Sequence, residues 1–126
     1  MKERTFKIFG SENEDSDVDR WREGLPPGAR ARMDQIISYM EIQRDWTKTS
    51  YFRPLTAYKG ICEIRFIVQN IQYRPLGCYG PGEKEFTILV GAEEKGDRFN
   101  PKSAPQLAVK RRKVILESKG YTHEYC

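Results

Sequence analysis

The chain has 126 residues, a length that suits one domain able to bury a hydrophobic core without a metal or disulfide staple. Apolar residues make up 38% and charged residues 32%, and the formal net charge is +4, which predicts a globular, well-solvated, basic protein. A run of about 18 apolar residues does not occur, so the sequence excludes a membrane-spanning helix.

The first elements in chain order are a short strand and a short helix. Thr5–Phe9 alternates polar and apolar residues, as a half-buried strand does. An acidic loop, residues 11–16, follows, and Ser16 or Asp17 can cap a helix over Val18–Glu23.

The longest helix comes next. Pro26 and Pro27 suit its first turn, where a missing N–H has no partner to lose. Its apolar residues recur at helical spacing, which predicts a core-facing stripe and not a cofactor site: Ala29, Met33, Ile36, Ile37 and Met40. The helix should end near Asp45, and Thr47–Tyr58 is interpreted as an irregular loop.

Three strands are predicted in the middle of the chain, over Ile61–Val68, Gln72–Tyr79 and Glu85–Ala92. Gln69-Asn70 is a plausible tight turn between the first two. Pro75 cannot donate a hydrogen bond to a neighbouring strand, so a bulge or a sheet edge is expected there.

A loop over Glu93–Pro101, a helix from Ser103 to Gly120 and a flexible tail, residues 121–126, complete the chain. The order β-α-α-β-β-β-α predicts one α+β domain over residues 1–126, with a small, mostly antiparallel sheet packed against helices. We expect the helices to cover one face of the sheet and the other face to stay partly open to a ligand.

The cysteines and the N-terminal residues indicate the compartment. Cys62 and Cys78 lie in strand-like apolar runs and are interpreted as buried, reduced thiols, and the odd cysteine count fits no zinc pattern. Met1–Phe9 carries charge and lacks the apolar segment of a signal peptide. We therefore expect a cytoplasmic protein without a metal or cofactor.

Charge is distributed unevenly along the chain. Between Glu12 and Glu23, six acidic residues stand against two basic ones, whereas from Lys95 onward eight basic residues stand against three acidic ones. One turn of the last helix carries four consecutive cations, Lys110, Arg111, Arg112 and Lys113. A basic C-terminal third suggests a polyanion such as RNA as partner, and an ordinary solvated surface explains the same charges.

Several catalytic schemes are excluded by the residues present. His123 is the single histidine and lies in the predicted tail, so a Ser-His-Asp or Cys-His arrangement is not expected, and a two-histidine nuclease pair is impossible. A glycine-rich phosphate loop is absent. A carboxylate pair such as Glu63 with Glu85 stays open without specific support.

The remaining candidates are arginines on predicted strands. Glu63 and Arg65 lie on one face of their strand because side chains alternate. If Gln69-Asn70 is the turn, Arg65 lies opposite Arg74, and two guanidinium groups on an open face form a phosphate-sized positive site. Alternatively, Arg65 pairs with Glu63 or Glu85 and only makes the sheet soluble.

Four stretches resemble, in order and spacing, the phage-derived branch of the RelE/HigB toxin superfamily: Leu25–Arg32, Gly60–Arg65, Tyr73-Arg74 and Ile88–Lys95. The resemblance covers roughly Leu25 to Glu117. It implies a RelE-like fold and a ribosome-dependent mRNA endonuclease, in which the substrate's own 2′-hydroxyl attacks the adjacent phosphorus. The protein in such a reaction orients the RNA and stabilises negative charge.

The resemblance also implies roles for particular basic residues. Arg65 and Arg74 match positions that face the scissile phosphate, and Lys95, in the loop after the last strand, joins them as a third catalytic candidate. The wider RNA-binding surface is predicted to include Arg98, Lys102, Lys110, Arg111, Arg112 and Lys113. The implied partners are mRNA, the ribosome and a helix-turn-helix antitoxin, and Tyr73 should point into the core.

The chain departs from the family pattern around its last predicted strand. Many relatives carry two lysines where Glu94-Lys95 keeps one, and Val90 replaces a histidine. Glu93 and Glu94 would repel RNA phosphates if they faced the groove. A non-catalytic, phage-derived RNA- or protein-binding module on the same fold is therefore a second hypothesis. A protein-interaction module whose acidic N-terminal segment meets a basic partner is a third.

Overall fold

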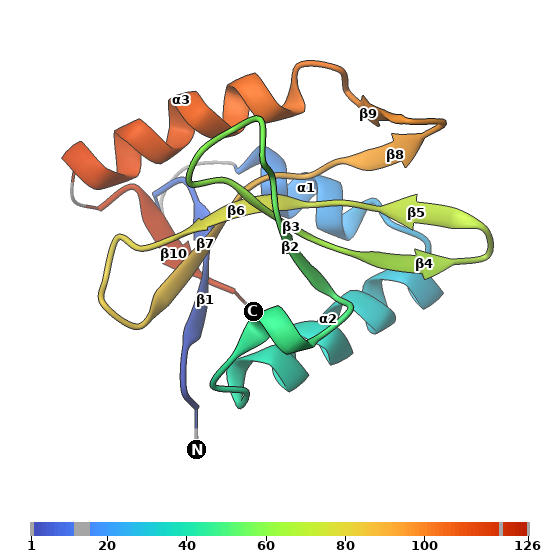
Figure 1. Ribbon diagram of the computed structural model, residues 1–126, viewed down its shortest axis with the longest axis horizontal. Helices are drawn as coiled ribbons and strands as arrows, with labels where there is room; N and C mark the ends of the chain where they lie inside the picture. The colour runs from blue at the N-terminus through green and yellow to red at the C-terminus, as the bar shows by residue number, and fades with distance from the viewer. Residues whose placement is uncertain (1, 12–15, 119, 126) are drawn as a thin grey trace.

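A computed structural model describes residues 2–11, 16–118 and 120–125 and shows an α+β fold (Figure 1). The helices are α1 (Asp17–Glu23), α2 (Pro27–Glu41), α3 (Ala104–Glu117) and a short 3-10 helix, η1 (Trp46–Lys48). The strands are β1 (Thr5–Phe9), β2 (Phe52–Pro54), β3 (Cys62–Ile64), β4 (Phe66–Val68), β5 (Ile71–Tyr73), β6 (Leu76–Tyr79), β7 (Glu85–Val90), β8 (Glu93–Lys95), β9 (Arg98–Asn100) and β10 (Thr122–Glu124). The predicted acidic loop lies mostly outside the described residues, and none of the described helices is long and apolar enough to cross a membrane.

The strands form two sheets. The larger, mixed sheet has the order β10-β1-β7-β6-β3-β2, with β1 and β7 parallel, and the smaller, antiparallel sheet has the order β4-β5-β8-β9. The α+β class is confirmed, but the strands are more numerous than predicted. The β8–β9 hairpin lies in a predicted loop, and η1 and β2 lie in another. These strands are three residues long and largely polar, so they lack the apolar alternation by which a strand is recognised in sequence.

Two of the predicted strands are each interrupted at one point. The first comprises β3 and β4, the second comprises β5 and β6, and one antiparallel register runs through both halves. Pro75 explains the interruption: it accepts a hydrogen bond of 2.9 Å from the Ile64 N–H but has no N–H to return. The expected bulge appears one residue later, as a register shift against β7 between Leu76 and Gly77.

The turn between β4 and β5 is confirmed. Gln69 and Asn70 both have positive φ, 50° and 67°, as a two-residue type I′ hairpin turn requires. The resulting β4–β5 ribbon projects from the side of the molecule, next to the β8–β9 hairpin (Figure 1).

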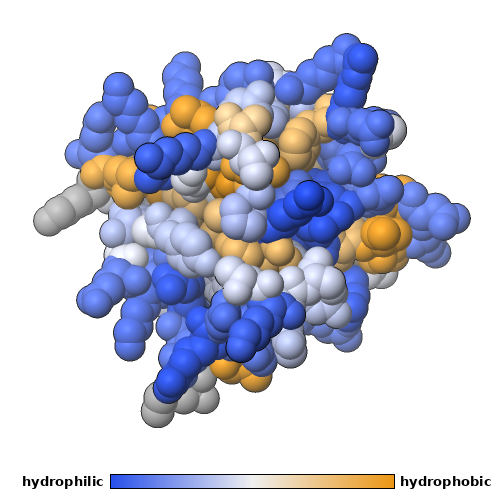
Figure 2. All heavy atoms as spheres, in the orientation of Figure 1, coloured by the Kyte–Doolittle hydropathy of each residue, from blue (hydrophilic) through white to orange (hydrophobic). Residues whose placement is uncertain are grey.

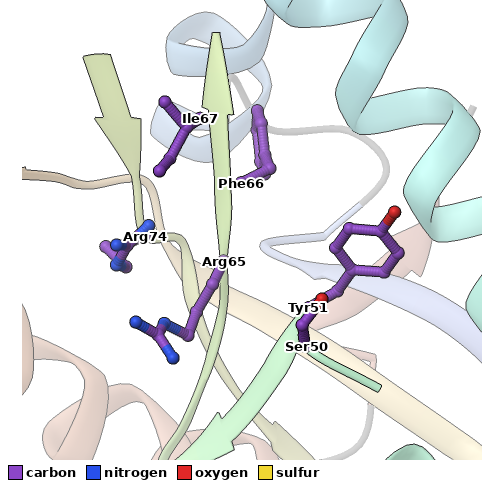
Figure 3. A pocket seen from close by; sticks show the side chains of 6 residues that line it. All are labelled: Ser50, Tyr51, Arg65, Phe66, Ile67 and Arg74. Atoms are coloured by element: carbon purple, nitrogen blue, oxygen red, sulfur yellow. The ribbon is translucent and has the colours of Figure 1, made fainter. Parts of the chain in front are cut away.

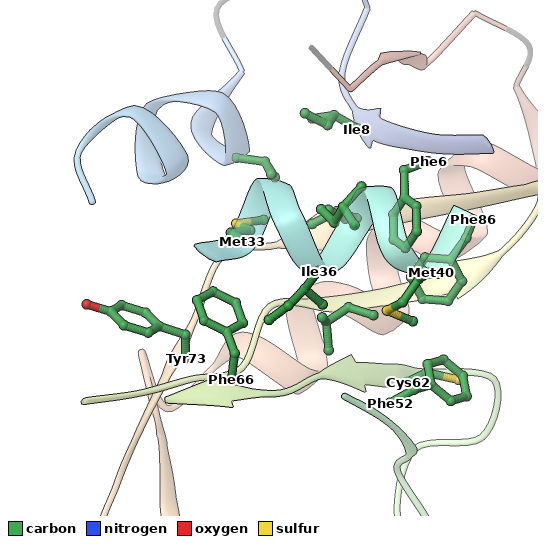
Figure 4. Packing of buried hydrophobic residues seen from close by; sticks show 14 of the residues in the cluster. Phe6, Ile8, Met33, Ile36, Met40, Phe52, Cys62, Phe66, Tyr73 and Phe86 are labelled. Carbon is green, nitrogen blue, oxygen red and sulfur yellow. The ribbon is translucent and has the colours of Figure 1, made fainter. Parts of the chain in front are cut away.

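Helices lie on both faces of the larger sheet, which corrects the expectation of one covered face (Figure 1). On one face, Met33, Ile36 and Met40 of α2 belong to one buried cluster with Phe6 of β1 and Phe86 of β7, and Figure 4 shows Met40 near these two rings. On the other face, α3 packs against β6 and β7. Arg65, between β3 and β4, and Arg74, between β5 and β6, lie where the smaller sheet adjoins the larger one.

α2 ends at Glu41, earlier than the predicted end near Asp45. The Glu41 carbonyl accepts hydrogen bonds from the N–H groups of Glu3 and Arg4, at 2.7 and 3.2 Å. The Glu41 carboxylate accepts another from the Phe6 N–H at 3.0 Å. These tertiary bonds to the N-terminal segment replace further helical ones and stop the helix.

The C-terminal segment contains a strand, β10, over residues 122–124, where a tail without regular structure was predicted; residue 126 lies outside the described residues. β10 pairs antiparallel with β1, and Tyr125 packs against the main core. His123, which we expected in a frayed end, has its Nε2 2.6 Å from the Asp19 carboxylate. β10 forms because it pairs with β1, which is far from it in the sequence, so the local residues of β10 do not predict a strand.

The two described cysteines are confirmed as buried, free thiols. Burial raises the pKa of Cys62 to about 11 and that of Cys78 to about 12. Both thiols therefore stay protonated and weakly reactive at neutral pH.

Candidate functional site

Arg65 and Arg74 lie opposite each other where the two halves of the ribbon meet. Phe66 pairs with Tyr73 beside them, and the register continues through the two arginines. Their backbone N–H groups donate to neighbouring segments, at 2.7 and 2.8 Å, and not to each other's strand. Such a non-hydrogen-bonded pair brings opposed residues close together, so both side chains share one face.

Both arginines line one cavity of about 320 Å³ (Figure 3). The other lining residues are Ser50, Tyr51, Phe66 and Ile67. In Figure 3 the two guanidinium groups lie on the same side of β4, and Tyr51 and Ser50 lie on the other side. The Arg65 side chain is 34% exposed and the Arg74 side chain 3%, so Arg65 is accessible to a ligand and Arg74 forms a deep wall.

Strongly hydrophilic side chains gather in the middle of the molecular face shown in Figure 2, over the region where β3 and β6 meet the β4–β5 ribbon. Apolar atoms lie next to them along that ribbon, where Ile67 and Ile71 are 61% and 40% exposed. The cavity thus combines cationic donors with an apolar border, as ligand sites commonly do.

Arg74 is held rigidly but keeps one unused donor. Its Nη1 donates to the Tyr73 carbonyl at 2.9 Å, and its Nη2 donates to the Gln72 side chain. Its Nε lies 3.7 Å from the Glu94 carboxylate and has no hydrogen-bond acceptor in the described part of the chain. Burial lowers the pKa of Arg74, and the nearby Glu94 charge opposes that shift. A guanidinium nevertheless stays protonated in proteins, so the deep wall is cationic.

Glu63 is the acidic neighbour of Arg65. Its Oε1 lies 3.4 Å from the Arg65 Nε, which is buried and has no hydrogen-bond acceptor among the described residues. Burial raises the pKa of Glu63, and the charges of Arg65 and Arg74 oppose this. Glu63 and Arg65 therefore attract each other as opposite charges, as the alternative hypothesis expects. Glu63 does not, however, accept a hydrogen bond from the Arg65 Nε.

Glu93 and Glu94 face opposite sides of β8. Glu94 lies opposite Gln72 and approaches Arg74, whereas Glu93 lies opposite Tyr73. Burial raises the pKa of the Tyr73 phenol, and the Glu93 charge adds to this. Of the two acidic residues, Glu94 alone adds negative charge to the arginine site. Tyr73 is 2% exposed, which confirms its predicted place in the core.

Three other predicted cations lie outside the arginine cavity. Lys95 lines a separate hollow together with Asn70–Gln72 and the two acidic residues of β8. Arg98 and Lys102 line another cavity, beside the start of α3. The fold therefore brings Arg65 and Arg74 together but does not bring the predicted catalytic Lys95 to them.

Arg111 of α3 is turned inward. It donates to both carboxylate oxygens of Asp17, at 2.8 and 2.6 Å, and to the Leu89 carbonyl at 2.8 Å. Its guanidinium lies 4.7 Å from the centre of the Phe9 ring. These contacts occupy the Arg111 guanidinium with groups of the protein itself.

The other three cations of α3 are less constrained. Arg112 lies over the turn at Gly60, where a Cβ would come within 2.9 Å of its guanidinium carbon; Gly60 also has a φ of +86°. Lys110 and Lys113 are exposed. None of these three residues lines the arginine cavity.

Sequence reasoning missed part of the site. Ser50 and Tyr51 line the cavity from a segment interpreted as an irregular loop, and the Tyr51 hydroxyl accepts a hydrogen bond of 2.9 Å from Arg32. The alternative in which Arg65 pairs with Glu63 is present as a charge contact, and the i, i+2 spacing of the two residues was its signal in the sequence.

No protein-family model, curated protein or solved structure matches this chain, so the RelE/HigB resemblance depends on the sequence stretches quoted above. Among the described residues, His, Cys, Asp and Glu side chains form no group of three or more suited to hold a metal ion. What the site offers is one fixed and one accessible guanidinium. Such groups bind phosphate oxygens through paired N–H donors and stabilise added negative charge.

Proposed function

We propose that this chain is an RNA endonuclease of the RelE/HigB type that acts on mRNA in the ribosome, with its site at the Arg65–Arg74 cavity. One observation carries the proposal: two guanidinium groups share a cavity, and each has a buried Nε without an acceptor in the described part of the chain. A buried, unsatisfied donor costs roughly 1–3 kcal/mol, and a phosphate oxygen would recover that free energy.

In the proposed reaction the RNA 2′-hydroxyl oxygen bonds to the adjacent phosphorus, and the bond from phosphorus to the 5′-oxygen breaks. The 2′-hydroxyl proton passes to water, and the leaving 5′-oxygen takes up a proton from water. The products are a 2′,3′-cyclic phosphate and a 5′-hydroxyl. Arg65, the accessible cation, binds the scissile phosphate, and Arg74 stabilises the extra negative charge from the deep wall. Glu63 positions Arg65.

Binding of RNA without cleavage is the second candidate, and one observation favours it. The Arg74 side chain is 3% exposed, and the Glu94 carboxylate lies 3.7 Å from its Nε. A substrate phosphate must compete with this carboxylate for Arg74, whereas binding at Arg65 alone needs no such exchange.

The test is induced expression of the wild type, Arg65→Ala and Arg74→Ala in bacteria, with growth and mapped mRNA ends as readouts. The matched control is Arg44→Ala, because Arg44 is an arginine outside the cavity whose side chain is 88% exposed. We expect growth arrest and new mRNA ends with the wild type and the control. Loss of Arg65 should reduce cleavage about 100-fold, the typical effect of removing one charge-stabilising donor.

Two results would redirect the proposal. Well-folded wild-type protein that leaves growth unchanged contradicts a toxin. Saturable RNA binding with no cut product, also on purified ribosomes, selects the non-catalytic alternative.

A further inference from the structure

A second cavity, of about 280 Å³, lies between the loop before β3, the β8–β9 hairpin and the start of α3. It is lined by Tyr58, Asp97, Arg98, Phe99, Lys102 and Pro105. Two aromatic rings and two cations thus meet in one hollow, and the proposed cleavage uses none of them.

Phe99 is connected to the arginine site by the register of the smaller sheet. Phe99 lies opposite Glu94, and Glu94 lies opposite Gln72. Directly opposed side chains share a face, and Gln72 and Glu94 both contact Arg74. Phe99 therefore lies on the same face as Arg74, and it is two strand spacings, or about 10 Å, from Gln72.

The aromatic walls are fixed and the cations are free to reach a ligand. Tyr58 and Phe99 are half-buried and pack against the core under α3. The Tyr58 hydroxyl accepts a hydrogen bond of 3.3 Å from the Gln106 side chain. Arg98 and Lys102 are exposed. Half-buried aromatic faces beside exposed cations are the combination that binds unpaired nucleotides, because every base offers a π-face and every linkage a phosphate.

We propose that this cavity binds the base and phosphate of an unpaired RNA nucleotide, close to the nucleotide held at Arg65 and Arg74. The inference rests on the proposed RNA function and adds a second contact point, which orients the strand along the face. The base stacks on Tyr58 or Phe99, and Arg98 and Lys102 bind phosphate. Asp97, the acidic member of the lining, accepts a hydrogen bond from an amino group of the base.

The test measures the affinity of the purified full chain for a labelled single-stranded RNA of six nucleotides and for a strand of equal length with abasic positions. The wild type should bind the base-containing strand about tenfold more tightly, since stacking on an aromatic side chain has about this effect per base. Tyr58→Leu and Phe99→Leu keep an apolar side chain without a π-face and should remove the preference. Tyr58→Phe should keep it.

The two exposed cations give a second measurement that does not endanger the fold. Replacing Arg98 and Lys102 together by alanine should reduce the slope of log affinity against log salt by about 0.7, because both cations bind one phosphate and each neutralised phosphate on a single strand contributes about this much. The control is Arg44→Ala, which should leave the slope unchanged because the Arg44 side chain is 88% exposed and lies outside the cavity.

The possible failures are distinguishable. If neither strand binds, the RNA function itself is wrong. Binding with equal affinity for both strands, or a base preference that survives in both leucine variants, overturns the base site and leaves RNA binding at Arg65 standing. An unchanged salt slope in the Arg98 and Lys102 double variant overturns the phosphate part of the site.

Discussion

Arg22, on α1 beside Asp34 of α2, and Arg65, in the cavity, are both partly buried arginines next to a carboxylate, yet their surroundings differ. Arg22 donates to both oxygens of Asp34, at 2.9 Å each, and to the Tyr125 hydroxyl at 2.9 Å, and its guanidinium lies 4.8 Å from the centre of that ring. Arg65 has a charge contact of 3.4 Å to Glu63 and a buried Nε without an acceptor in the described residues.

The carboxylates beside structural arginines and beside the cavity arginines differ in the direction in which their pKa is shifted. Asp17 is bound by Arg111, and that hydrogen bond holds the pKa of Asp17 below its usual 3.8. Glu63 is buried, and this burial raises its pKa above the usual 4.5 despite two arginines nearby. An arginine whose N–H groups all have acceptors stabilises the fold. An arginine with an N–H group that lacks an acceptor contributes less to stability but can donate a hydrogen bond to a ligand. The contrast separates structural arginines from candidates for RNA binding.

The largest expected effect is on stability, from Arg22→Ala. The change leaves the Asp34 carboxylate without its cation and removes the hydrogen bond from Arg22 to the Tyr125 hydroxyl, which keeps its own bond to Asp34. We expect a loss of about 3 kcal/mol in the free energy of unfolding. Urea denaturation measures it. The exposed Arg44 provides the control, and Arg44→Ala should change the value by less than about 0.5 kcal/mol. Equal effects of Arg22→Ala and Arg44→Ala would contradict a structural role of Arg22.

Arg111→Ala should cost about 2 kcal/mol at neutral pH, because a paired group with a backbone acceptor is lost. The folded-state pKa of Asp17 is lowered, so its stabilising effect is present above its usual 3.8 and is lost as pH falls through the lowered value. The difference between wild type and variant should therefore shrink between about pH 5 and pH 2. Denaturation over a pH series measures this, and a constant difference argues against the ion pair.

Glu63→Gln should show the opposite pH dependence. Because the folded-state pKa of Glu63 is raised, the wild type is relatively most stable at low pH and loses stability as pH rises from 4.5 through the raised value. Glutamine does not titrate, so the variant should gain on the wild type as pH rises. The same denaturation series measures it. A gain toward low pH instead would show that Arg65 saturates Glu63 after all.

Apart from the Arg44 control, the smallest expected change in stability is that of Arg65→Ala. A half-exposed arginine with one loose charge contact contributes at most about 1 kcal/mol to folding. Arg65→Lys keeps the charge without the planar fork and should be as stable while still losing RNA cleavage. A loss above about 2 kcal/mol for Arg65→Ala would place it with Arg22 as a structural residue.

Local signals in the sequence predicted much of the fold. Ser16 caps α1 by accepting a hydrogen bond of 3.3 Å from the Asp19 N–H, and every predicted stripe residue of α2 is buried. The signals failed where distant segments decide the outcome. The end of α2 depends on hydrogen bonds from residues 3–6, and β10 depends on pairing with β1. Short polar strands such as β8 carry no apolar pattern and form because a partner strand accepts them.

The sequence by itself determined that Arg65 and Arg74 face each other, because a two-residue turn at Gln69-Asn70 sets the register of a hairpin from local geometry. Only the tertiary structure decided which arginines have donors to spare. The carboxylates that saturate Arg111 or approach Arg74 come from other elements, Asp17 from α1 and Glu94 from β8. Whether an arginine is paired depends on its distance from carboxylates on other elements, and these distances cannot be read from the residue types alone.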